Sequence, residues 1–393
     1  MTSHFASAMR RASQQMRAQN LVEATRLIQE ALHSGPRVKP TDTDQSAQTR
    51  ERPPSATGGW GPGEQKADTR RSLSETWRDR KAGSFNPVDL GGFMRGSPAD
   101  PADRGSSIPP GARFETRSFT CAAGARSYKV YVPASAPQQP KGLIVMLHGC
   151  TQNPDDFAAG TGMNAVAEAH GFLVAYPAQT KSNNAFFCWN WFDPANQRRD
   201  AGEPAIIAGL TRELSSEFGL DRERVFAAGL SAGGAMAAVM GETYPELYSA
   251  ICVHSGLPTG SAHDMPSAFS AMRTARSHPD NVRRTTVRTI VFHGKADKTV
   301  HPSNAAAVLA QATPNAAAIC DDVVSGSSAD RGYRRTVVSD PEGRTVAELW
   351  MIDGAGHAWS GGQPGGSYAD PKGPDASAEI MRFFLGEPYQ ARA

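Results

Sequence analysis

RVFAAGLSAGGAMAAVMGETY, residues 224–244, decides the fold, because an apolar strand pattern runs straight into a helix pattern through Gly229-Leu230-Ser231-Ala232-Gly233. A G-x-S-x-G sequence between a strand and a helix is typical of a nucleophile elbow rather than of a merely structural turn. Small residues beside Ser231 let the strand and the helix approach closely. We therefore expect the serine hydroxyl to stand above the sheet, near the helix N-terminus, where the helix dipole favours negative charge.

Similar strand patterns occur on both sides of this segment, mostly with helical stretches between them. Continuous apolar runs are typical of strands inside a covered sheet, and alternation with helices indicates a mostly parallel sheet with helices on both faces. The sequence therefore predicts an α/β fold over residues 113–393, closed by a helix at 377–385. Further strands are expected at 127–133, 142–149, 171–177, 249–256, 288–294 and 347–353, and a helix at 155–169.

The first 112 residues differ in composition from this body. Apolar residues recur at helical spacing over residues 1–34, with arginines mostly off that stripe, which predicts an amphipathic helix. Such a helix either docks on the body or on another copy of it, or lies on an apolar surface. Residues 35–112 are rich in Pro, Gly, Ser, Thr and charge. We expect a disordered linker there, because this composition buries too little apolar area to offset the entropy of ordering.

Bulk composition argues against several classes of protein. The formal net charge of +2 gives no electrostatic basis for binding nucleic acid. No apolar run is long enough for a transmembrane segment. The N-terminus lacks the apolar core of a secretory signal, so we expect none. Five widely spaced cysteines argue against a dense disulfide scaffold and against zinc, and we expect neither a metal nor a cofactor.

Two residues are expected to activate Ser231, since a serine hydroxyl is a weak nucleophile that needs a base. His357 follows the last predicted strand in a glycine-rich loop that can carry its imidazole back to the serine. Asp297, directly after the strand at 288–294, is expected to orient this histidine. Asp353 is the competing acid, but it lies only four residues from His357. The order Ser231, Asp297, His357 is that of the α/β-hydrolase fold.

The oxyanion formed during acyl transfer needs two backbone N–H donors. One is expected from Ala232, the residue after the nucleophile. The other is expected from the loop after the strand at 142–149; we assign it to Cys150, with Thr151 as the alternative. His148, at the end of this strand, is interpreted as a structural histidine rather than as a base.

Three motifs occur together in one order: HGCTQ (148–152), CWNWF (188–192) and GLSAGGAMA (229–237). In this combination the chain resembles the polyhydroxybutyrate depolymerase family of esterases, which also contains feruloyl and acetylxylan esterases. The resemblance covers about residues 125–385. It implies an α/β-hydrolase fold and metal-free ester hydrolysis. The residues that match the family's triad and oxyanion amide are Ser231, Asp297, His357 and Cys150.

Side chains beside the expected site suggest how a substrate is held. Trp189 and Trp191 offer rigid apolar area for an acyl chain or a ring, although one of them is expected in the core. Thr151 is a further expected contact. The resemblance also implies a disulfide between Cys150 and Cys188, which is unusual in a reducing cytosol.

The leading hypothesis for the substrate is a short-chain 3-hydroxyalkanoate ester, as polymer or oligomer. Alternatives are feruloyl or acetyl esters of polysaccharide, peptide amides, and a non-catalytic role at the surface of a polyester granule. Without a signal for export, we expect a cytoplasmic protein that associates with polyhydroxyalkanoate granules; resemblance to secreted members makes an extracellular location the alternative.

Overall fold

The computed structural model describes residues 108–275, 287–313, 322–328 and 331–389. The predicted N-terminal helix at 1–34, and the predicted linker apart from its last residues, lie outside this described part. The described residues therefore belong almost entirely to the α/β body that was expected from residue 113 onward.

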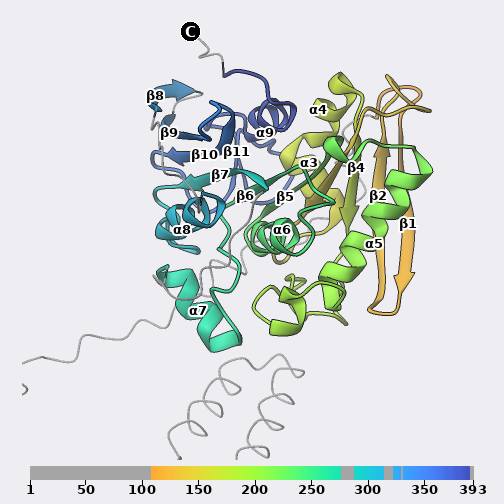
Figure 1. Cartoon of the computed structure of the whole chain (residues 1–393), viewed down its shortest axis with the longest axis horizontal. Helices are drawn as coiled ribbons and strands as arrows, with labels where there is room; N and C mark the ends of the chain where they lie inside the picture. The colour runs from red at the N-terminus through yellow and green to blue at the C-terminus, as the bar shows by residue number, and fades with distance from the viewer. Residues whose placement is uncertain (1–107, 276–286, 314–321, 329–330, 390–393) are drawn as a thin grey trace, which may run out of the picture. The chain divides into compact units, whose positions relative to one another are not determined.

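A mixed sheet in the order β1-β2-β4-β3-β5-β6-β7-β10-β9-β8 forms the centre of the described chain (Figure 1). The strands from β4 to β10 in this order pair in parallel, while β1-β2, β2-β4, β10-β9 and β9-β8 pair antiparallel at the two edges. The predicted, mostly parallel sheet is therefore confirmed. The bounds are β1 (Arg113–Cys121), β2 (Gly124–Val132), β3 (Leu143–Leu147), β4 (Leu173–Pro177), β5 (Val225–Leu230), β6 (Ala250–His254), β7 (Arg288–Gly294), β8 (Asp322–Ser328), β9 (Arg331–Ser339) and β10 (Thr345–Ile352).

Helices cover both faces of the sheet, as expected. Apolar residues of α5, α6 and α8 belong to one core cluster, and those of α3, α4 and α9 belong to another on the opposite face. The predicted helix at 155–169 is two helices, because Gly162 has the left-handed φ of 63° that ends one and begins the other. The bounds are α3 (Pro154–Thr161), α4 (Met163–His170), α5 (Gly202–Glu217), α6 (Ala232–Thr243), α7 (Met265–Arg273), α8 (Ser303–Ala312) and α9 (Ala376–Leu385), with short 3-10 turns at Pro194–Gln197 and Arg222–Arg224.

The central strands explain why the apolar runs in the sequence are continuous. Every residue of β3 is buried, because successive side chains point to opposite faces and both faces are covered. Leu143 and Val145 enter one cluster, whereas Ile144 and Met146 enter the other. The same burial holds for β5 and β6.

This arrangement also determines where a site can form. In a parallel sheet the carboxyl ends of the strands lie at one edge, and ligands bind in the crevice outside them. The loops that follow β3, β5, β7 and β10 therefore meet, and they carry residues 148–152, 231, 297 and 357. A small parallel pair, β11 (Trp359–Ser360) and β12 (Ala369–Asp370), shapes the chain after residue 357.

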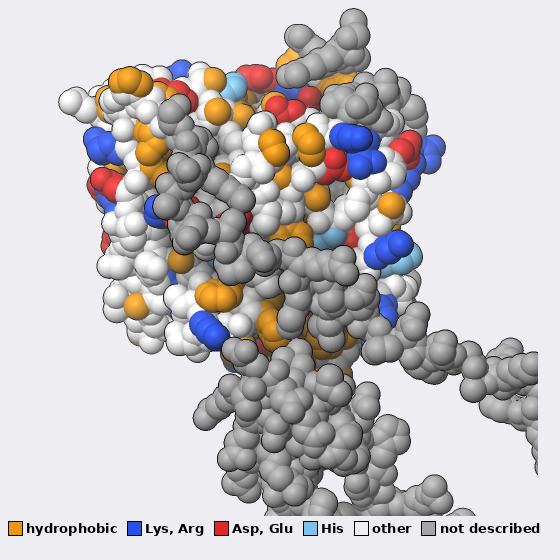
Figure 2. Space-filling view, turned by 180° about the vertical axis from the view of Figure 1, so that it is seen from behind, with side chains coloured by type: hydrophobic (Ala, Val, Ile, Leu, Met, Phe, Trp, Pro, Cys, Tyr) orange, Lys and Arg blue, Asp and Glu red, His pale blue; other side chains and the backbone are white. Residues whose placement is uncertain are grey.

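The outer surface carries charges of both signs. On the face that Figure 2 shows, the basic and acidic side chains are interspersed rather than gathered by sign. Among the described residues, the longest helices fall short of the length and apolar character that a membrane span requires.

Candidate active site

Ser231 lies in a sharp turn between β5 and α6. Its φ of 57° and ψ of −118° are sparsely populated for a residue with a side chain, and strain of this kind costs about 1–3 kcal/mol. Close packing holds the turn in place. A Cβ atom on Gly233 would lie 1.9 Å from the Leu147 carbonyl oxygen, so no larger residue fits there. The Ser231 N–H donates to the His254 carbonyl at 2.9 Å, which ties the turn to the next strand.

Asp297 and His357 meet from the loops after β7 and β10. His357 Nδ1 donates to Asp297 Oδ2 at 2.7 Å. The other carboxylate oxygen accepts from the N–H groups of Thr299, at 2.8 Å, and Val300, at 2.9 Å, so the carboxylate is fixed in position. The competing acid Asp353 lies instead in an exposed ion pair with Lys295.

The environment keeps Asp297 ionised. Burial alone raises the pKa of this carboxyl, but hydrogen bonds and charge from His293 and His357 outweigh burial and hold the pKa well below its usual value. His293 Nε2 lies 3.4 Å from Asp297 Oδ2 and donates to the Val300 carbonyl at 2.9 Å. An ionised Asp297 keeps a proton on His357 Nδ1, which leaves Nε2 of that ring free to accept one.

The loop after β3 leaves one amide available. The Gly149 N–H donates to Gln152 Oε1 at 2.9 Å, and the Thr151 N–H donates to the Phe186 carbonyl at 2.8 Å. Within the described part of the chain, the Cys150 N–H is the one in this loop without a hydrogen-bond partner. The alternative donor, Thr151, is therefore already engaged. Ala232 is the first residue of α6, and the Ser231 side chain accepts no capping hydrogen bond from this end of the helix.

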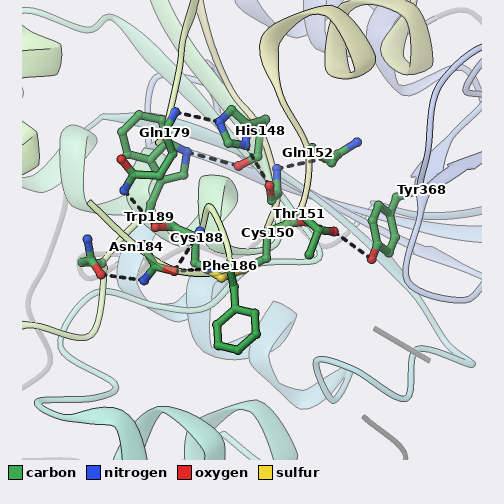
Figure 3. The surroundings of a disulfide bond; sticks show 12 residues. His148, Cys150, Thr151, Gln152, Gln179, Asn184, Phe186, Cys188, Trp189 and Tyr368 are labelled. Atoms are coloured by element: carbon green, nitrogen blue, oxygen red, sulfur yellow. Dashed lines mark hydrogen bonds between the residues drawn. A yellow bond between two sulfur atoms is a disulfide. The ribbon is translucent and has the colours of Figure 1, made fainter. Parts of the chain in front are cut away.

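A disulfide joins Cys150 to Cys188, 38 residues later, as the family resemblance implied (Figure 3). The second segment is held in turn by Asn184 Oδ1, which accepts from the N–H groups of Phe186 at 2.9 Å and Cys188 at 3.3 Å. Together with the Thr151–Phe186 hydrogen bond, the disulfide connects the loop after β3 to the segment 184–188 at two adjacent points. The conformation of Cys150 therefore depends on this second segment.

Several of the expected site residues line one hollow on the surface. Its lining includes Ser231, His357 and Cys150, so side chains from the loops after β3, β5 and β10 share one surface. The described residues show no hydrogen bond between the Ser231 and His357 side chains. Such bonds are often long or poorly aligned in the absence of substrate.

Two buried histidines support the loops around this hollow. His148 Nδ1 donates to the Gly149 carbonyl at 2.8 Å and its Nε2 accepts from the Gln179 N–H at 3.1 Å. His254 Nε2 accepts from the Ser360 N–H at 3.0 Å. Burial lowers the pKa of His148 to about 4 and that of His254 to about 3, so both rings are neutral near pH 7. These contacts fit the structural interpretation of His148.

The residues expected to contact substrate differ in exposure: the two tryptophans are buried, and Thr151 is exposed. Trp189 is 0% exposed, and its indole N–H donates to the His148 carbonyl at 3.1 Å. Trp189 is therefore the member of the pair that lies in the core, as expected for one of the two, and substrate contact by Trp191 stays a prediction. Trp191 is 7% exposed and packs edge-on against Phe192. Thr151 is exposed beside the hollow.

Sequence reasoning missed residues that only long-range contacts bring to the site. Tyr368 lines the hollow, and its ring lies edge-on to His357 with centroids 6.4 Å apart. Gln152 connects the loop after β3 to the Tyr368 segment, because its Nε2 donates to the Ser367 carbonyl at 3.1 Å. Nothing in the glycine-rich stretch GGSYAD (365–370) marks the tyrosine as part of a site.

Comparison with known families and proteins identifies the family of this chain. The family model described as Esterase PHB depolymerase matches residues 126–336, which is more than half of the chain. Poly(3-hydroxyalkanoate) depolymerase C of Paucimonas lemoignei is 32% identical over 238 residues, which cover 58% of this chain and 56% of that protein. The chain thus spans little more than half the length of this relative.

Two further proteins are similar to this chain, one in sequence and one in fold. Feruloyl esterase B of Neurospora crassa is 31% identical over 202 residues, which cover 46% of this chain and 67% of that protein. The structure of an acetyl xylan esterase from Aspergillus awamori superposes with a TM-score of 0.56 at 21% identity, over 70% of this chain and 99% of that one. This likeness confirms the α/β-hydrolase fold.

Proposed function

The chain belongs to the PHB depolymerase family of esterases, and from that premise we propose that it hydrolyses carboxylic esters through an acyl-enzyme on Ser231. The observation that carries the proposal is the hydrogen bond from His357 Nδ1 to the buried Asp297, beside a strained serine that lines the same hollow as His357. A nucleophile, a base and an orienting acid at one surface are the requirements of acyl transfer.

The first half of the reaction forms the acyl-enzyme. Ser231 Oγ attacks the ester carbon while His357 Nε2 takes the hydroxyl proton. The carbonyl π electrons move to oxygen, and the N–H groups of Cys150 and Ala232 stabilise this oxyanion. When the intermediate collapses, the C–O bond to the alcohol breaks, and the alcohol leaves with the proton from His357.

Water completes the cycle in the second half. His357 Nε2 takes a proton from water, whose oxygen attacks the acyl carbon. A second oxyanion forms in contact with the same two amides. Its collapse breaks the bond to Ser231 Oγ, which regains the proton from His357, and the carboxylic acid is released. Asp297 stays ionised throughout and stabilises the imidazolium.

The substrates that we propose are esters of short-chain 3-hydroxyalkanoic acids, as polymer or oligomer. The Paucimonas lemoignei relative supports this class, because its name is that of a poly(3-hydroxyalkanoate) depolymerase. Feruloyl esters of polysaccharide are the second candidate, supported by the relative from Neurospora crassa.

A substrate panel tests both parts of the proposal. The native chain, Ser231→Ala and Ser249→Ala would be compared on 3-hydroxybutyrate oligomers, methyl ferulate and a peptide anilide. Ser249 precedes β6 at the end of the strand away from the site, so its variant is the matched control. We expect Ser231→Ala alone to lose ester turnover, and hydroxybutyrate oligomers to be cleaved fastest. Full activity of Ser231→Ala would overturn the mechanism; a preference for ferulate would replace the substrate class.

A further inference from the structure

We propose that Tyr368, acting with Thr151, binds a hydroxyl group of the substrate next to the ester that is cleaved. The inference rests on the proposed ester hydrolysis and adds a specificity-determining residue to it. Its basis is the position of the phenol, the direction of its hydrogen bond, and the way the backbone holds it.

The position of Tyr368 is within reach of the reacting groups. The residue lines the same hollow as Ser231, Cys150 and His357. Its hydroxyl lies 3.2 Å from Thr151 Oγ1, next to the expected oxyanion donor Cys150, and Figure 3 shows this pair pointing toward each other. A substrate ester placed over Ser231 therefore has the phenol oxygen beside it.

The hydrogen bonds around the pair determine what the pair can bind. Thr151 Oγ1 donates its single proton to the Cys150 carbonyl at 2.6 Å. In the contact between the two hydroxyls, Tyr368 must then be the donor and Thr151 the acceptor. The phenol proton is thus used, and the phenol oxygen keeps its acceptor capacity.

An acceptor of this kind selects a donor on the substrate. An ester group has only acceptor oxygens, so the complementary group is a hydroxyl elsewhere on the molecule. Two sources carry one near the ester: the acyl part of a 3-hydroxyalkanoate unit at the free-hydroxyl end of an oligomer, and the alcohol part of a sugar ester. The shared chemistry is a hydroxyl beside the scissile bond.

The backbone holds the pair in a fixed arrangement. Tyr368 and Thr151 both have left-handed φ values, 51° and 66°, which are strained for residues with side chains. Such strain persists only where the surroundings impose it, and it clusters at functional sites. The preceding Ser367 N–H donates to Asp156 Oδ1 at 2.8 Å. Gln152 contacts Asp156 and the Ser367 carbonyl, so one polar network positions both strained residues.

The test removes the phenol oxygen and keeps the ring. Tyr368→Phe in the full chain retains the edge contact with His357. It would be compared with the native chain on two pairs of esters: methyl 3-hydroxybutyrate against methyl butyrate, and a monoacetylated methyl xyloside against cyclohexyl acetate. Tyr333→Phe is the matched control, because its hydroxyl bonds Tyr389 away from the hollow.

We expect kcat/KM of Tyr368→Phe to fall about tenfold on the hydroxylated member of one pair and to change less than about twofold on the ester that lacks the hydroxyl. The affected pair identifies the source of the hydroxyl. Equal changes on both members of each pair, with turnover intact, would overturn the inference and leave the proposed function standing. Absence of turnover of all four esters by the native chain would overturn both.

Discussion

His357 Nδ1 donates to Asp297 Oδ2 at 2.7 Å, although the two residues are 60 positions apart in the chain. The bond selects one ring tautomer and one orientation, and the carboxylate is itself held by two backbone N–H groups. The function of the proposed base therefore depends on Asp297, whose side chain is buried behind His357 and does not line the hollow.

Replacement of this acid tests that dependence. We expect Asp297→Asn to lower kcat by about 10⁴-fold with a smaller change in KM, because the amide leaves the imidazole in the wrong tautomer. Asp353→Asn is the control, since Asp353 pairs with Lys295 at the surface. Steady-state kinetics on one soluble ester measure both variants. A large loss in Asp353→Asn with full activity in Asp297→Asn would reverse the assignment.

The disulfide predicts a coupled loss of stability and rate. Simultaneous Cys150→Ser and Cys188→Ser should lower the free energy of unfolding by about 2–4 kcal/mol, as expected for opening a loop of this length. It should also lower kcat, because the Cys150 N–H is held in place through the segment 184–188. Urea unfolding and initial rates measure the two effects, and treating the native chain with a dithiol should reproduce them. Cys121→Ser, at the partly exposed end of β1, controls for a cysteine-to-serine change at a free cysteine. Unchanged kcat in the double variant would contradict the role of the bridge.

Stability should decrease as the pH is lowered below about 6.5. An unfolded histidine binds a proton near that pH, whereas folded His148 and His254 stay neutral until about pH 4 and about pH 3. Between these values the unfolded chain holds more protons than the folded chain. The free energy of unfolding therefore decreases as the pH is lowered, by about 1.4 kcal/mol per pH unit for each histidine. The contribution is fully present above pH 6.5.

Urea unfolding at about pH 7 and about pH 5 measures this slope. His254→Gln keeps an acceptor for the Ser360 N–H but no longer titrates, so the variant should lose about half of the slope. If the free energy of unfolding stayed constant over this range, the two rings would have to be equally protonated in both states.

The N-terminal region gives the last prediction, because every site residue lies after residue 112. We propose that a truncated chain starting near Arg113 folds and hydrolyses soluble esters at close to the full rate. The apolar stripe and arginines in residues 1–34 suit adsorption to a polyester granule, which would raise the local concentration of the catalytic part. Truncation should then reduce activity on insoluble polyester more than on a soluble ester. An unchanged ratio would point to docking or oligomerisation instead, and an insoluble truncated chain to a helix that covers the core.

The sequence by itself was sufficient for the central architecture and the chemistry-bearing loops. Continuous apolar runs predicted the covered parallel strands, since burial on both faces is a local property that each strand carries in its own composition. The strand-turn-helix context of Ser231, and the order in which Asp297 and His357 follow other strands, predicted which residues meet at the sheet edge. The family predicted from three short motifs was confirmed by a model that spans most of the same region.

Tertiary structure alone decided the remaining features. The edge strands β1 and β8, and β9 next to β8, lack a strong apolar run and are held by pairing with their neighbours. Cys150 rather than Thr151 has the free amide because Phe186, from another loop, takes the Thr151 N–H. Trp189 lies in the core with its indole N–H donated to the His148 carbonyl, and Tyr368 contacts Thr151, 217 residues earlier in the sequence. Local composition cannot predict these contacts, because each contact forms only when segments far apart in the sequence pack together.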